Sequence, residues 1–178
     1  MISNSYHLLN KHPMFDMQKE KVNLNGVSFG LSEAGYDIRI AEDIHFKRGL
    51  FGSRSVVVTQ FYDPETPESL IVDRQVHKGR FTLASAIEEF CMPDNLVGIV
   101  HDKSTWARCG LSVFNTVIEP GWRGFLTLEL VYHGDGNLFI PAGSGIAQVV
   151  FHETTCAANY NGKYQHQPQG PTGPILAK

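Results

Sequence analysis

Leucine occupies every second position from Leu126 to Leu130, and Phe125, Thr127 and Glu129 occupy the alternate positions. Side chains on a β-strand point alternately to opposite faces, so this pattern predicts a strand with one apolar face. We expect the leucines to face the core of the protein. The carboxylate of Glu129 should then project from the other face of a strand that is held in place by core contacts.

Other short segments show the same alternation between turn residues. Tyr36, Ile38 and Ile40 alternate with Asp37 and Arg39, which is typical of a half-buried strand. We expect Asp37 and Arg39 to form cross-strand or inter-subunit ion pairs on a solvated face. Strands are also predicted in the ranges 44–47, 56–62, 70–76 and 145–151, and a short helix capped by Ser or Asn near residues 3–9. Short strands at this spacing predict an all-β sandwich or barrel.

Length and charge narrow the class of protein. With 178 residues and 42% hydrophobic content, one domain over residues 1–178 is expected, because such a chain can bury most of its surface around one core. The formal charge of -3 gives no overall basic field, so nucleic acid is not an expected partner. The sequence contains neither an apolar run of the length needed to span a membrane nor a signal-peptide pattern, which predicts a cytoplasmic protein and no membrane partner.

The cysteines and tryptophans are interpreted as structural residues. Cys91, Cys109 and Cys156 are odd in number and widely spaced, which favours reduced, buried or half-buried thiols over disulfides or a zinc site. Trp106 and Trp122 could stack on a base, but indoles in a β-barrel more often pack in a core or an interface.

Four side chains suited to binding an anion follow an apolar run. Lys103, Ser104, Thr105 and Arg108 lie within six residues, directly after the predicted strand 96–100. Cations and hydroxyl groups donate hydrogen bonds to phosphate oxygens. The pattern therefore predicts a local anion-binding turn.

The chain from residue 154 onwards is rich in Asn, Gln, Gly and Pro. Such a segment cannot bury enough apolar area to fold alone, so it is either a disordered tail or docks on another surface. Its residues Tyr160, Lys163, Tyr164 and Gln167 are of the kinds that can close over a nucleoside triphosphate.

Seven fragments, in this order, resemble the motifs of dCTP deaminases. They are residues 32–39 (SEAGYDIR), 81–84 (FTLA), 93–98 (PDNLVG), 103–111 (KSTWARCGL), 119–130 (EPGWRGFLTLEL), 146–148 (IAQ) and 163–165 (KYQ). Some of these motifs are shared with dUTPases. The resemblance implies the distorted β-barrel of the dUTPase-like β-clip fold, with minor helices, usually as a homotrimer with active sites between subunits. It also implies that residues 154–178 form a tail that closes over the active site.

The resemblance assigns a role to each matching residue. The phosphate-binding turn would comprise Lys103, Ser104, Thr105 and Arg108, and the catalytic carboxylate would be Glu129. Around the base and deoxyribose it places Glu119, Thr127 and Gln148. In the tail that covers the triphosphate it places Tyr160, Lys163 and Gln167.

Deamination of cytosine at C4 needs a base for the attacking water and an acid for N3 and the leaving ammonia. One positioned carboxyl group can carry both protons, and Glu129 is the candidate for it. Ser104 could hold the water, and Arg108 could neutralise phosphate or steady the carboxylate. The His-x-Glu and Pro-Cys-x-x-Cys runs of zinc-dependent deaminases are absent from the sequence, so no zinc is expected. Mg²⁺ is expected only as a companion of the substrate triphosphate.

Three departures from the deaminase pattern keep other functions open. Lys103 stands where these families commonly have arginine, the 113–122 hairpin is about two residues shorter than usual for a deaminase, and Glu119 replaces the usual aspartate. The chain could therefore be a dCTP deaminase that makes dUTP, a dUTPase or bifunctional enzyme that releases pyrophosphate, or a non-catalytic nucleotide-binding protein. Inhibition by dTTP and the choice between trimer and hexamer stay open.

Overall fold

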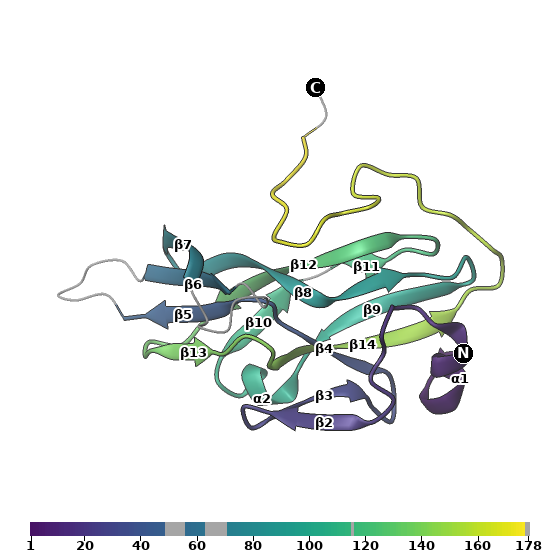
Figure 1. The fold of residues 1–178 in the computed structure, drawn as a ribbon, viewed down its shortest axis with the longest axis horizontal. Helices are drawn as coiled ribbons and strands as arrows, with labels where there is room; N and C mark the ends of the chain where they lie inside the picture. Colours follow the sequence, from purple (N-terminus) through teal and green to yellow (C-terminus); the bar gives the residue numbers. More distant parts are fainter. Residues whose placement is uncertain (49–55, 63–70, 115, 177–178) are drawn as a thin grey trace.

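The chain folds into three antiparallel sheets (Figure 1), and the computed structural model describes residues 1–48, 56–62, 71–114 and 116–176. The largest sheet contains β1 (Ile2–Ser3), β2 (Lys21–Leu24), β3 (Val27–Leu31), β4 (Tyr36–Arg39), β9 (Leu96–Asp102), β11 (Val117–Ile118) and β14 (Gly145–Glu153). Its strands follow the order β11-β9-β14-β4-β3-β2, and β1 pairs with β14. The all-β prediction is confirmed.

The two smaller sheets complete the fold. One has the order β10-β12-β8 and is built from β8 (Phe81–Cys91), β10 (Leu111–Phe114) and β12 (Arg123–Tyr132). The other has the order β13-β5-β6-β7 and is built from β5 (Asp43–Lys47), β6 (Val56–Tyr62), β7 (Ile71–Lys78) and β13 (Leu138–Ile140). The described helices are short: α1 (Ser5–Lys11) and α2 (Ser104–Ala107). The strands expected near residues 36–40, 44–47, 56–62, 70–76 and 145–151 are all found.

The three sheets surround one core without closing into a continuous hydrogen-bonded barrel within the described ranges. The segment that follows β4 reaches β8, where Ile40 bridges Ala86 and the Ala41 N–H donates to the Ser85 carbonyl at 2.9 Å. This contact coincides with a register shift between Phe125 and Thr127 of β12, where β8 carries extra residues. The result, over the described residues, is a distorted barrel whose sheets are not closed, as the family resemblance implies.

The alternation along β12 is confirmed at Leu128 and Leu130, which are fully buried. Leu126 differs, because it lies at the register shift, where it is only half-buried and lines a cavity. The extra residues in β8 therefore place Leu126, a predicted core residue, at the wall of this cavity.

Asp37 and Arg39 both form ion pairs, as predicted, but the prediction that they lie on a solvated face is wrong. Asp37 is 2% exposed, and its Oδ2 lies 2.6 Å from the Lys103 Nζ. The Arg39 Nε lies 2.8 Å from Oε1 of the buried Glu88. The reason is topological: β4 lies between β14 and β3 in the middle of the sheet, and residues far along the chain cover both of its charged side chains.

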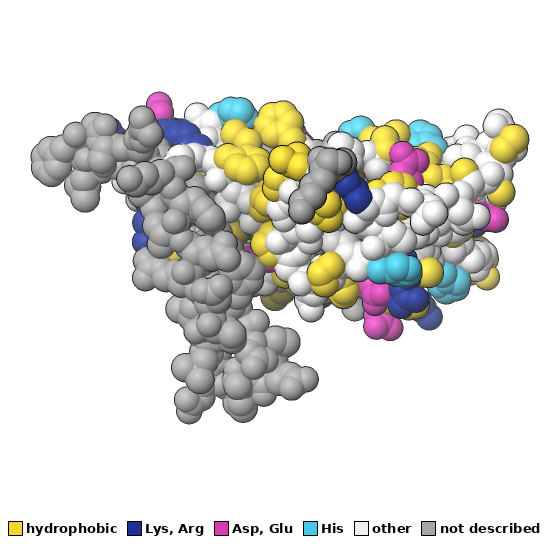
Figure 2. All heavy atoms as spheres, turned by 90° about the horizontal axis from the view of Figure 1, so that it is seen from above, with side chains coloured by type: hydrophobic (Ala, Val, Ile, Leu, Met, Phe, Trp, Pro, Cys, Tyr) yellow, Lys and Arg dark blue, Asp and Glu magenta, His cyan; other side chains and the backbone are white. Residues whose placement is uncertain are grey.

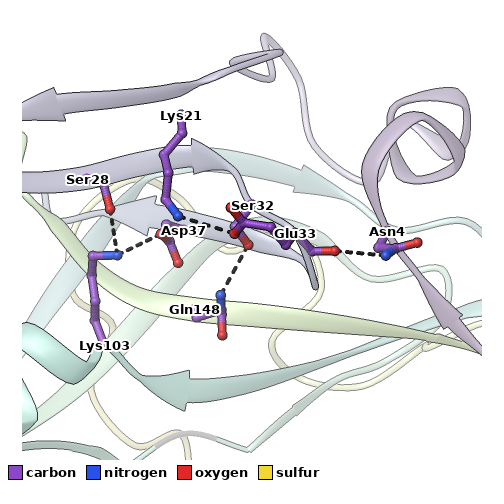
Figure 3. Close-up of polar contacts among 8 residues, drawn as sticks. All are labelled: Asn4, Lys21, Ser28, Ser32, Glu33, Asp37, Lys103 and Gln148. Atoms are coloured by element: carbon purple, nitrogen blue, oxygen red, sulfur yellow. Dashed lines mark hydrogen bonds and ion pairs between the residues drawn. The ribbon is translucent and has the colours of Figure 1, made fainter.

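Several smaller expectations are also settled. Both tryptophans are buried in the core, as predicted. Cys91 is half-buried, but Cys109 and Cys156 are exposed, contrary to prediction; all three are free thiols. Asn4 precedes α1 but does not cap it, since its side chain donates instead to the Glu33 carbonyl (Figure 3). None of the described helices is long and apolar enough to cross a membrane.

Candidate active site

A cavity of about 860 Å³ opens beside β12. This volume lies in the range typical of sites for small molecules and cofactors. Its walls come from β8, from the hairpin between β10 and β12, from β12 itself and from the tail after β14. The lining residues are Phe81, Leu83, Thr116, Val117, Ile118, Glu119, Trp122, Leu126, Thr127, Glu129, Tyr160, Tyr164, Gln167, Thr172, Gly173 and Pro174. Asn115, in the same hairpin, lies outside the described residues.

Glu129 lines this cavity, as its place on the strand predicts. Its backbone is paired with Leu83 on one side and with Phe114 on the other, so the middle strand of a sheet holds its position. In the described ranges, its carboxylate has no hydrogen-bond or ion-pair partner. A carboxylate without a partner that borders a cavity can accept and return a proton.

Two other residues expected near the base and sugar line the same cavity. Glu119 follows β11, so the cavity contains a second carboxylate on the wall formed by the hairpin. Thr127 precedes Glu129 by two residues, and its Oγ1 accepts hydrogen bonds from the Gln167 side-chain amide and, at 3.0 Å, from the Thr172 N–H. The hydroxyl of Thr127 therefore connects the strand to the tail.

The described part of the tail, residues 154–176, docks on its own chain. It runs along the start of β12, where the Phe125 N–H donates to the Gln167 carbonyl at 3.0 Å and the His166 N–H to the Arg123 carbonyl at 2.9 Å (Figure 1). This close approach requires glycine at position 124, where a Cβ would lie 2.7 Å from the Gln167 backbone. Docking by backbone hydrogen bonds explains how so polar a segment is held in place.

Side chains also hold the tail at the hairpin. The Trp122 Nε1 donates to the Tyr164 carbonyl at 2.7 Å, and the Tyr160 N–H donates to the Pro120 carbonyl at 2.8 Å. Tyr160 and Gln167 consequently line the cavity. Lys163 does not: its Nζ donates to the Ile175 carbonyl and lies 5.1 Å from the centre of the Tyr164 ring.

Sequence reasoning missed part of the cavity wall. Tyr164 lines it but was assigned only to the tail in general, and Thr172, Gly173 and Pro174 were not singled out. Small and proline residues in a polar segment carry no pattern that marks a cavity wall. The KYQ motif was the one available signal for Tyr164.

The predicted anion-binding turn lies elsewhere in the chain. In α2 and directly after it, Ser104, Thr105 and Arg108 are exposed, and none of them borders the cavity. Figure 1 shows α2 on the side of the molecule opposite the tail. Within one copy of the chain, the turn and the carboxylate cavity are therefore two separate surfaces.

Lys103 and Gln148 lie on the same side of the molecule as the anion-binding turn, and not at the cavity. The Lys103 Nζ lies 2.6 Å from Asp37 Oδ2 and 3.2 Å from Ser28 Oγ. Gln148 on β14 is paired with Asp37 of β4, and its side-chain amide donates to Ser32 Oγ at 3.1 Å (Figure 3). Neither residue lines the cavity.

No group of three His, Cys, Asp or Glu side chains suited to binding a metal ion occurs among the described residues. The cavity lining offers proton transfer by the carboxylates of Glu119 and Glu129, next to hydrogen-bonding groups and apolar walls. The exposed turn offers cationic and hydroxyl donors.

Comparison with known proteins identifies the family. A family model described as dCTP deaminase-like matches residues 15–154. A dCTP deaminase of Campylobacter concisus is 39% identical over 170 residues, covering 90% of this chain and 88% of the relative. A dCTP deaminase of Methylacidiphilum infernorum is 34% identical over 181 residues, covering 95% and 94%. A solved structure of EIAV dUTPase is similar with a TM-score of 0.47 and 17% identity, covering 74% of this chain and 85% of that chain. The chain therefore belongs to the dCTP deaminase-like family.

Proposed function

We propose that this protein is a dCTP deaminase, which converts dCTP and water to dUTP and ammonia. The observation that carries the proposal is the carboxylate of Glu129, without a partner in the described ranges, at the wall of a cavity of about 860 Å³. Relatives named dCTP deaminase, 34–39% identical over most of the chain, support the substrate.

Glu129 is the group that moves protons. It takes one proton from the water as its oxygen bonds to C4 of the cytosine ring, and passes that proton to N3. It then takes the remaining proton from the same oxygen and passes it to the amino group, so that the C4–N bond breaks, ammonia leaves and the C4 carbonyl of uracil forms. Each cycle ends with the carboxylate regenerated. Glu119 and Thr127 face the same cavity and bind the base and deoxyribose around this reaction, and Gln167 of the tail that covers the triphosphate also lines this cavity.

The complete site lies between copies of the chain, in a homotrimer. The exposed turn of one copy, with Ser104, Thr105 and Arg108, meets the cavity of the next, so that Ser104 holds the water and Arg108 neutralises phosphate. Both surfaces are incomplete for dCTP on their own, since no cation occurs among the described residues that line the cavity and the turn at residues 103–108 has no carboxylate. Figure 2 shows the face that carries the tail, and hydrophobic side chains gather on this face, where the next copy would bind.

Apolar side chains around the cavity support this association. Phe81, Phe114 and Val117 are 52%, 55% and 45% exposed; Phe81 and Val117 line the cavity, and Phe114 is paired with Glu129. Large exposed apolar groups at one place are typical of an interaction surface. Light scattering of the purified protein distinguishes a monomer, a trimer and a hexamer.

The tail covers the triphosphate in the bound state. Tyr160 and Lys163 bind the phosphates there, which requires the Lys163 Nζ to leave the Ile175 carbonyl. Gln148 supports the site from the sheet beside the turn.

Mg²⁺ enters with the triphosphate as part of the substrate. We expect dTTP, which shares the triphosphate and deoxyribose, to compete for the same site. A cytoplasmic location follows from the free nucleotides that the enzyme uses.

One observation favours a second candidate function. Glu119 lies in the same cavity as Glu129, where a carboxylate could activate a water for attack on the triphosphate of dUTP. A dUTPase or a bifunctional enzyme would then release pyrophosphate.

One incubation separates these functions. Purified protein is supplied with dCTP or dUTP and Mg²⁺, and ammonia and pyrophosphate are measured separately. Ammonia alone is the result expected of a deaminase. Pyrophosphate from either nucleotide indicates the second function, and nucleotide binding without either product indicates a binding protein.

A further inference from the structure

The first residue of the anion-binding turn points into the protein. Lys103 is 9% exposed, and its ammonium group contacts Asp37 Oδ2 at 2.6 Å and Ser28 Oγ at 3.2 Å (Figure 3). Asp37 is 2% exposed and paired with β3 and β14 on either side. A cation held this way by a buried carboxylate is directed away from any ligand on the surface.

The turn is built on the backbone of the same lysine. The Lys103 carbonyl accepts the N–H groups of Trp106 and Ala107, both at 3.0 Å. The Trp106 Nε1 donates to the Gly145 carbonyl at 2.7 Å from a buried indole. The buried side chains of Lys103 and Trp106 are three residues apart and therefore lie on the same side of the helical turn. The opposite side of the turn is left free.

The exposed side is the one that carries the expected phosphate-binding groups. Ser104, Thr105 and Arg108 are exposed, whereas Lys103 and Trp106 are buried. Asp37 has no second means of compensating its charge, because its Oδ1 is buried without a hydrogen-bond partner. Loss of Lys103 would therefore leave a buried carboxylate without a counter-ion, which strongly disfavours the present arrangement of the turn.

We infer that Lys103 and Asp37 are positioning residues, which orient the phosphate-binding turn through a buried ion pair instead of contacting the phosphates. This inference rests on the proposed function, in which Ser104, Thr105 and Arg108 bind the triphosphate. It gives Asp37, a residue that the cavity does not contain, a role in substrate affinity.

Two single variants distinguish positioning from direct contact, because the two roles predict opposite results for Asp37→Asn. Asparagine keeps the shape of the side chain and removes its charge, which frees Lys103. If Lys103 positions the turn, Asp37→Asn and Lys103→Met both weaken dCTP binding by about tenfold or more, since small misplacements of binding groups have large effects. If Lys103 contacts phosphate, only Lys103→Met weakens binding, and Asp37→Asn leaves it unchanged or tightens it.

A control and a second ligand exclude general damage to the fold. Lys21→Met removes an exposed lysine from the neighbouring hairpin, where it pairs with Glu33 at 3.3 Å, and should leave dCTP affinity unchanged (Figure 3). Deoxycytidine, measured as a competitive inhibitor, lacks phosphates, so its affinity should stay unchanged in Asp37→Asn. An equal loss for dCTP and deoxycytidine would overturn the inference.

The double variant Lys103→Met with Asp37→Leu tests the pair as a unit. An apolar pair of similar shape removes both buried charges, so we expect dCTP affinity to recover to within about threefold of wild type. No recovery in a double variant that unfolds at the wild-type temperature would contradict positioning.

Arg108→Gln separates this inference from the proposed function. If dCTP affinity is unchanged in Arg108→Gln as well as in Asp37→Asn, the turn does not bind phosphate, and the proposed function fails at that point. If Arg108→Gln weakens binding while Asp37→Asn does not, only the positioning role is wrong.

Discussion

Replacing Glu42 by glutamine should make the protein more stable at neutral and alkaline pH. Glu42 is 1% exposed, and its Oε2 accepts the Ser85 N–H at 2.8 Å. Burial raises the pKa of this carboxyl from its ordinary 4.5 to about 7, because the charged form loses its hydration there. Glutamine keeps an oxygen for the Ser85 N–H and has no proton to lose.

The direction in which stability changes with pH depends on whether the folded or the unfolded chain holds the proton of Glu42. Below pH 4.5, Glu42 is protonated in both the folded and the unfolded chain, and the contribution of its raised pKa to stability is fully present. Between pH 4.5 and about 7, the unfolded chain loses the proton while the folded chain keeps it, so the free energy of unfolding falls as pH rises. At 1.36 kcal/mol per pH unit, the loss is about 3 kcal/mol once the pH exceeds the folded pKa.

Urea unfolding at a series of pH values and one protein concentration measures this effect. The free energy of unfolding of Glu42→Gln minus that of wild type should rise by about 3 kcal/mol between pH 4.5 and pH 8. Burial also raises the pKa of Glu88 against the opposing effect of Arg39, but that group titrates alike in both proteins and cancels in the difference. Glu20→Gln, at an exposed position, serves as the matched control. A difference that does not change with pH would refute the reasoning.

Three further predictions concern the catalytic group, the tail and the core. Glu129→Gln should abolish ammonia release and leave dCTP affinity within a few fold, and unchanged turnover would remove Glu129 from the mechanism. Gly124→Ala should displace the tail, because the new Cβ would lie 2.7 Å from the Gln167 backbone; limited proteolysis after residue 154 should become faster, and an unchanged rate would contradict the docking. Leu128→Ala should lower the free energy of unfolding by about 2–5 kcal/mol in urea, since the residue is fully buried. A loss below about 1 kcal/mol would place Leu128 outside the well-packed core.

The sequence allowed the strands and the acid to be located. Alternation is a local signal, so β12 and the direction of Glu129 could be read from neighbouring residues. The register shift opposite Leu126 could not, because it depends on extra residues in β8 that the alternation within β12 does not reveal.

The contacts of charged residues were harder to predict than the strands. Lys103 and Asp37 are 66 positions apart in sequence, and each reads locally as a surface charge. The tail posed a different problem, since composition reports apolar area and not the backbone hydrogen bonds that dock it beside Arg123 and Phe125. The exposure of Cys109 and Cys156 likewise has no local sequence signal.

The central claim is that Glu129 of one copy acts with the Ser104–Arg108 turn of another, and a mixing experiment tests it most directly. Glu129→Gln and Arg108→Gln, each inactive or nearly so alone, are produced together with different tags, and mixed assemblies are purified through both tags. Each mixed trimer has one site among its three that combines an intact carboxylate with an intact turn, so ammonia release should be restored to about a third of the wild-type rate. Mixed assemblies that remain as inactive as the single variants would contradict the shared site and would place the whole reaction within one copy.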